Sequence, residues 1–203
     1  MGGRASAELE AYGFYPAGGG AIRLAIKPTT ETHALSLEDR GERTGEKVVA
    51  VVANLSGGIA DRELKTLLKA MNLKPEQGEI IHAEGPGPGN AVTLFLEHEN
   101  VTEVFIGLGE HGIRTEAVAK KVAQQAQKYL PAKDGSGQIS TAVGEHLADQ
   151  LLLPMALFSG GVFTTTDISQ HTRTNIDIIK RFLDVEVKMT QLGRKCWKIE
   201  VLK

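Results

Sequence analysis

The sequence predicts a mixed α/β protein, and three observations support that fold class. Its 203 residues, 41% hydrophobic and 24% charged, are typical of one or two globular domains. A continuous run of valine and alanine over residues 48–53 is typical of a strand covered on both faces of its sheet. Apolar residues then recur at helical spacing from Leu64 to Met71. Strand and helix patterns alternate in this way along most of the chain, as they do in α/β folds.

Composition and charge exclude several classes of protein. The chain has 25 acidic and 23 basic residues, a net charge of −2, which argues against a nucleic-acid coat protein or a polybasic membrane anchor. A single cysteine, Cys196, leaves no internal disulfide and favours a reducing compartment. The longest apolar stretch, residues 151–158, is far shorter than the ~20 residues of a membrane span. The N-terminal residues are not typical of a signal peptide, so we expect a cytoplasmic protein that does not bind membranes.

The first 45 residues predict strands and connections. Apolar and polar residues alternate over residues 21–27, which predicts a half-buried strand that begins after the glycine turn at residues 18–20. A second, weaker strand is expected within residues 28–43. The first strand has no evident partner before residue 46, so the chain is expected to begin in the interior of a domain.

Residues 46–131 predict a compact β-α-β-β-β-α block. The strand and helix named above are followed by three strand-like segments, at residues 79–83, 92–96 and 101–106. A helix over residues 114–130 comes next and is ended by Pro131. The GPGPG stretch of residues 85–89 is expected to be a plain loop. The block is large enough to bury its own core.

The C-terminal part predicts an α-β-α-β-β order. It follows a segment with the composition of a linker, DGSGQ at residues 134–138. The expected elements are helices over residues 143–158 and 172–183, a strand over 162–168 and a closing hairpin of 185–189 with 195–202.

One candidate site lies between a strand and a helix, at SQHTRTN (residues 169–175). Free backbone N–H groups and the helix dipole favour an anion there, with Thr172 as the expected cap. A neutral imidazole at His171 can attack phosphorus and form a covalent intermediate. On spacing alone, an ordinary polar residue in a turn is the simpler interpretation of His171.

A second candidate lies on the helix that contains GEHLADQ (residues 144–150). His146, Asp149 and Gln150 lie at i, i+3 and i+4, so their side chains can face one cavity suited to a nucleotide or a metal-bound phosphate. A solvated helix face is the alternative interpretation. Neither the triple glycine at 18–20 nor GLGEHG at 107–112 matches a P-loop or dinucleotide fingerprint. Zinc-protease, thiol-redox and hydrolase motifs are absent from the sequence.

Together, three segments resemble the RNA 3′-terminal phosphate cyclase family. They are YGFYPAGGGAI (residues 12–22), GEHLADQLLLPMAL (144–157) and SQHTRTNI (169–176), in the family's order and spacing. The resemblance implies an enzyme that uses ATP and a divalent metal, Mg or Mn, to convert an RNA 3′-phosphate end into a 2′,3′-cyclic phosphate. It implies that His171 is the catalytic nucleophile, which takes AMP from ATP and passes it to the RNA. It also implies that the ATP-binding segment comprises His146, Leu147, Ala148, Asp149 and Gln150.

The resemblance further implies a fold of repeated α/β units in which the last unit is interrupted by a small thioredoxin-like insert. Residues 1–45 and 134–203 would then belong to the main domain, and residues 46–133 would form the insert. Family members carry more chain ahead of Met1, so this chain is expected to be the C-terminal portion of a cyclase. Two alternatives stay open: a non-catalytic cyclase-like scaffold of ribosome biogenesis, which the presence of His171 disfavours, and an inactive fragment that lacks part of the ATP site.

Overall fold

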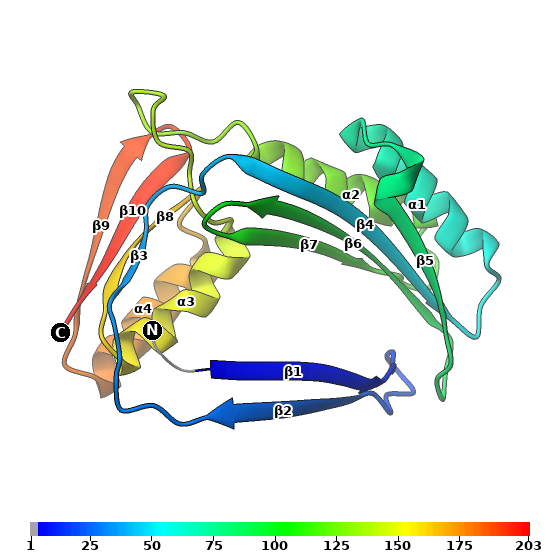
Figure 1. Ribbon diagram of the computed structural model, residues 1–203, viewed down its shortest axis with the longest axis horizontal. Coiled ribbons are helices and arrows are strands. Elements are labelled where there is room, and N and C mark those ends of the chain that lie inside the picture. The colour runs from blue at the N-terminus through cyan, green and yellow to red at the C-terminus, as the bar shows by residue number, and fades with distance from the viewer. Residues whose placement is uncertain (1–3) are drawn as a thin grey trace.

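A computed structural model, which describes residues 4–203, confirms a mixed α/β fold with three sheets (Figure 1). The strands are β1 (Arg4–Ala11), β2 (Ala21–Lys27), β3 (Leu35–Leu37), β4 (Arg43–Ala53), β5 (Gly78–Ala83), β6 (Gly89–His98), β7 (Thr102–Leu108), β8 (Gly161–Thr165), β9 (Glu186–Gly193) and β10 (Cys196–Leu202). The helices are α1 (Gly58–Met71), α2 (Thr115–Tyr129), α3 (Glu145–Leu157) and α4 (Gln170–Phe182), with a short 3₁₀ helix at Pro75–Gln77. Both predicted element orders, β-α-β-β-β-α and α-β-α-β-β, are confirmed.

The first four-stranded sheet has the order β5-β4-β6-β7, and α1 and α2 cover one of its faces (Figure 1). The central strand β4 pairs parallel with β5 and antiparallel with β6. Val48, Ala50 and Val52 of β4 are buried towards the helices. Val49 and Val51, on the other face, are only half-buried. The expectation that both faces of β4 are covered is therefore wrong, because the two helices of this unit pack on the same side of the sheet.

The second four-stranded sheet has the order β3-β8-β10-β9 and packs against α3 and α4. Its core contains Leu152 and Met155 of α3, Phe163 of β8, Ile176 of α4 and Ile199 of β10. β3 is the weak strand expected after residue 28, and it joins this sheet as a parallel neighbour of β8. A chain segment before the predicted insert thus shares a sheet with segments after it. The division into residues 1–45, 46–133 and 134–203, and the likeness of the insert to thioredoxin, stay predictions.

The hairpin of β1 and β2 corrects two expectations. The partner of β2 is β1, upstream of it, with Ala7 opposite Leu24 and Leu9 opposite Ile22. The apolar side chains that predicted a half-buried strand are exposed; Ile26, for example, is 71% exposed. Alternation identifies the apolar face of a strand, but burial requires a second layer against that face. In the described part of the chain the two strands of the hairpin lie apart from both cores, and only the turn that joins them approaches the end of the first sheet (Figure 1).

The predicted linker at residues 134–138 is a closed, hydrogen-bonded loop. The Asp134 carboxylate accepts hydrogen bonds from the Ile139 backbone N–H at 3.0 Å and the Ser136 hydroxyl at 2.6 Å. These donors lower the pKa of Asp134. Lys133 and Ser140 form a β-bridge at the base of the loop. Within residues 4–203, no helix has the length and apolarity needed to cross a bilayer.

Candidate active site

The first predicted segment forms the start of α4. Ser169 is the N-cap residue, and its Oγ accepts a hydrogen bond from the Thr172 N–H at 3.1 Å. The expectation that Thr172 caps the helix is therefore wrong, because α4 begins two residues earlier than predicted and buries Thr172 in its first turn. His171 lies in that same turn and is exposed to solvent, so it is a helical residue with an accessible imidazole.

The second predicted segment forms the first two turns of α3. His146 and Gln150 are exposed, while Leu147 and Asp149 are half-buried. Ala148 is completely buried and belongs to the core beneath the helix. The segment therefore has an exposed imidazole, an exposed amide and a half-buried carboxylate, and the single cavity that the spacing argument expects them to face stays a prediction.

Asn175 links these two segments. Its Nδ2 group donates to the Asp149 backbone carbonyl at 3.1 Å and to the Asp149 carboxylate Oδ1 at 3.0 Å. His171 and Asn175 are spaced i, i+4 on α4, so they share one face of that helix. The start of α4 is thereby held against α3, with His171 one turn from the Asn175–Asp149 contact. The role of Asn175 was missed from the sequence, although its spacing from His171 was a usable signal.

A buried polar cluster connects the helical layer of the first sheet to the start of α3. Glu103 of β7 is 3% exposed, and its Oε2 accepts a hydrogen bond from the Gly144 N–H at 3.1 Å. Burial raises the pKa of Glu103 to about 7. Arg40, also buried, lies with its guanidinium 4.5 Å from the centre of the Tyr129 ring. The Tyr129 hydroxyl donates to the Ala142 carbonyl at 2.9 Å. Glu103 was missed from the sequence, although it shares a strand face with Phe105, and a charged residue at such a position is a signal.

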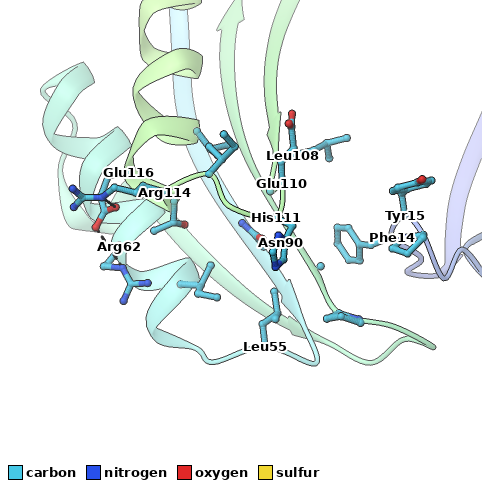
Figure 2. A pocket seen from close by; sticks show the side chains of 18 residues that line it. Phe14, Tyr15, Leu55, Arg62, Asn90, Leu108, Glu110, His111, Arg114 and Glu116 are labelled. Atoms are coloured by element: carbon cyan, nitrogen blue, oxygen red, sulfur yellow. Dashed lines mark ion pairs between the residues drawn. The ribbon is translucent and has the colours of Figure 1, made fainter.

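A cavity of about 1170 Å³ lies elsewhere, between the hairpin loop, the start of α1 and the start of α2 (Figure 2). The GLGEHG segment contributes Gly109, Glu110 and His111 to its wall. Glu116 forms ion pairs with Arg62 at 3.5 Å and with Arg114 at 3.6 Å. His171 and residues 146–150 are not among the residues that line this cavity. The cavity therefore does not coincide with the two predicted segments.

The two glycine-rich loops of the sequence pack against each other at the edge of this cavity. Phe14 from the hairpin loop lies so close to Gly89 that a Cβ added there would be 2.1 Å from the ring carbon Cγ. A Cβ added to Gly87 would lie 2.4 Å from the Ala17 methyl group. Figure 2 shows Phe14 pointing towards the end of the sheet, whereas Tyr15 beside it is 95% exposed. The GPGPG stretch is thus a contact surface for the hairpin loop, where glycine is needed for close approach.

No group of three histidine, cysteine, aspartate or glutamate side chains among residues 4–203 is arranged to hold a metal ion. Asp149 is the half-buried carboxylate of the two candidate segments, and one carboxylate is not a metal site by itself. We therefore assign no residue of this chain to a metal.

Comparison with known proteins decides the family. The model of the RNA 3′-terminal phosphate cyclase family matches residues 1–189. The chain belongs to the RNA 3′-terminal phosphate cyclase family. The three segments that suggested this family all lie within the matched residues, so the resemblance is confirmed.

Several relatives named RNA 3′-terminal phosphate cyclase are similar to this chain. The Koribacter versatilis protein is 42% identical over 192 residues, which cover 94% of this chain and 52% of the relative. The Pseudomonas fluorescens protein is 38% identical over 201 residues, covering 98% and 56%. The Salmonella paratyphi C protein is 40% identical over 180 residues, covering 89% and 50%. The chain thus spans about half the length of these cyclases.

Proposed function

We propose that this chain takes part in the ATP-dependent conversion of an RNA 3′-terminal phosphate to a 2′,3′-cyclic phosphate, with His171 as the nucleophile. The observation that supports this most directly is the position of His171. It is exposed in the first turn of α4, one turn before the Asn175 side chain that bonds Asp149 of α3. Both helices lie within the residues that match the cyclase family.

The first step of the proposed reaction is nucleotidyl transfer to the imidazole. The lone pair of His171 attacks the α-phosphorus of ATP, a P–N bond forms, and the bond to the leaving pyrophosphate breaks. The start of α4 suits this step, because backbone N–H groups at a helix N-terminus stabilise an anionic phosphate. His146, Asp149 and Gln150 would contact the nucleotide from α3, and Asn175 would hold Asp149 in place for that contact.

Two further steps complete the reaction. An oxygen of the RNA 3′-phosphate attacks the adenylyl phosphorus, which breaks the P–N bond and frees His171. The neighbouring ribose 2′-hydroxyl then attacks the 3′-phosphorus, loses its proton, and expels AMP as the cyclic phosphate forms. A divalent ion, Mg or Mn, would neutralise charge on the transferred phosphoryl group when bound.

The experiment that tests this proposal is intact-protein mass spectrometry after incubation with ATP and Mg or Mn. We expect the wild-type chain to gain the mass of one adenylyl group, and His171→Ala to gain none. His111→Ala is a matched control, because His111 is also exposed but lies in the loop at the cavity wall. Adenylylated His171→Ala protein, or wild-type protein that never gains the group, would contradict the proposal.

A second assay separates the enzyme from a non-catalytic scaffold. An oligoribonucleotide with a 3′-phosphate should become resistant to phosphatase in the presence of ATP, and the same oligoribonucleotide with a 3′-hydroxyl should be unchanged. RNA binding without formation of the cyclic phosphate would favour the scaffold.

A further inference from the structure

Helix α3 lacks a cap from its own sequence. Its N-cap residue, Gly144, has no side chain to accept a hydrogen bond from the first turn. In a capping box, a Glu or Gln at the third helical position accepts from the N-cap N–H. That position is Leu147 in α3, which has no acceptor. The Gly144 N–H instead donates to Glu103 Oε2 at 3.1 Å, so a strand far away in the sequence supplies the missing acceptor.

Gly144 and Glu103 fit each other closely. A Cβ added to Gly144 would lie 2.7 Å from Glu103 Oε1, which is closer than a methyl group can approach an oxygen. Glycine at this position therefore lets the carboxylate reach the N-cap amide. A carboxylate beside a helix N-terminus also interacts favourably with the helix dipole.

Glu103 reaches this place because of its position in the sheet. β7 is an edge strand of the β5-β4-β6-β7 sheet, and α3 begins beside the first residues of β7 (Figure 1). Glu103 and Phe105 point to the helix-covered face of the sheet and are both buried. The Glu103 carboxylate thus lies between the covered face of this sheet and the first turn of α3.

Arg40 and Tyr129 lie near Glu103, and His98 packs against the Tyr129 ring. Arg40, between β3 and β4, interacts with the carboxylate and donates to the Tyr129 carbonyl at 3.1 Å. The Tyr129 ring of α2 contacts both the Arg40 guanidinium and the ring of His98 of β6, whose centre is 6.0 Å from that of Tyr129. Burial and the nearby Arg40 lower the pKa of His98, so the imidazole is neutral near pH 7 and Arg40 is the cation of this cluster.

We propose that Glu103 is a positioning residue that holds the start of α3, and through it the segment His146–Gln150, in the arrangement that receives ATP. The proposal rests on the proposed function for its link to ATP, but its structural part is independent of activity. Glu103 would act through the Gly144 amide and would not touch the nucleotide itself.

The structural part is tested by NMR on the whole chain. In the wild type, we expect the Gly144 amide resonance to shift with pH and to show an inflection near pH 7, where Glu103 ionises. This inflection should vanish in Glu103→Gln, in which the side chain keeps an acceptor oxygen but does not titrate. Glu63→Gln is the matched control: Glu63 is also a completely buried glutamate of raised pKa, but it accepts from Asn90 and lies away from α3.

The functional part is tested by the ATP concentration that gives half-maximal adenylylation. Loss of the cap leaves the binding arrangement only partly populated, so Glu103→Ala should need about tenfold more ATP, with little change in the maximal rate. Glu103→Gln should restore the ATP requirement to within about twofold of wild type near pH 7, because an acceptor is present again. If Glu103 only stabilised the fold, its removal would lower the amount of folded protein and with it the maximal rate. The ATP concentration for half-maximal adenylylation of the remaining folded protein would then be unchanged.

The outcomes distinguish this proposal from the proposed function. The positioning role would be overturned, whatever the activity, if the Gly144 resonance of the wild type showed no inflection. It would also be overturned if Glu103→Gln showed the same inflection as the wild type. An unchanged ATP requirement in Glu103→Ala, in protein that is adenylylated, would overturn it as well. An inflection that depends on Glu103, in protein that is never adenylylated, would support the positioning of α3 and contradict the cyclase reaction.

Discussion

Replacing Glu103 by glutamine should change how the stability of this protein depends on pH. Burial raises the pKa of Glu103 from its ordinary value of 4.5 to about 7 in the folded chain. Between these values the folded state keeps a proton that the unfolded state has released. The stability that Glu103 contributes by holding this proton is therefore fully present below the pKa of the unfolded state. It is lost as the pH rises through the pKa of the folded state. Glu103→Gln cannot show this loss, because the glutamine does not titrate.

The size of the effect follows from the two pKa values. Because a difference of one pKa unit corresponds to about 1.4 kcal/mol, the whole shift is worth about 3.4 kcal/mol. Part of this is lost below about pH 5, so the wild type should lose about 2.5 kcal/mol relative to Glu103→Gln between about pH 5 and about pH 8. Glu63, whose pKa burial also raises, is present in both proteins and cancels in the difference. The free energy of unfolding would be measured by urea denaturation at several pH values, followed by circular dichroism and by the fluorescence of Trp197. Stability curves that run parallel for the two proteins would refute the reasoning.

Three further substitutions test the site and the core. Ser169→Ala removes the Oγ that accepts from the Thr172 N–H, and urea denaturation should show a loss of about 1 kcal/mol; an unchanged midpoint would mean that another group caps α4. Leu152→Ala leaves a cavity beneath α3, where the side chain is 1% exposed, and should cost about 2–5 kcal/mol in the same measurement, with a smaller loss indicating that the site collapses around the gap. Gln150→Ala, at an exposed position, should leave stability within about 0.5 kcal/mol of wild type while raising the ATP concentration needed for half-maximal adenylylation; equal ATP dependence would remove Gln150 from the nucleotide site.

Local patterns were sufficient to predict most elements of the fold. The valine-rich run became β4, the helical spacing of leucines became α1, and the order of elements was correct in both halves. These features follow from side-chain periodicity within a few residues, which the sequence shows directly. Helix ends were less well predicted, because the start of α4 depends on whether Ser169 or Thr172 accepts the capping hydrogen bond.

The sequence predicted which residue types form the candidate site, but it did not predict how their side chains are arranged. His171 and Asp149 were singled out from their segments, and Asn175 proved to be the side chain that joins the two helices. Hydrogen-bond partners distant in sequence are set by helix packing, which a single sequence does not specify. For the same reason GPGPG was expected to be a plain loop, whereas Gly89 makes room for Phe14.

By itself, the sequence determined the element types, the apolar faces and the segments that identify the cyclase family, because each depends on neighbours along the chain. The tertiary structure alone decided which of those faces are covered. It left the apolar side of the β1–β2 hairpin exposed and buried only one face of β4. It also brought Glu103 to the amide of Gly144, although 41 residues separate them in the sequence. Burial and long-range hydrogen bonds depend on how the sheets and helices pack, and so does the raised pKa that gives Glu103 its proposed role.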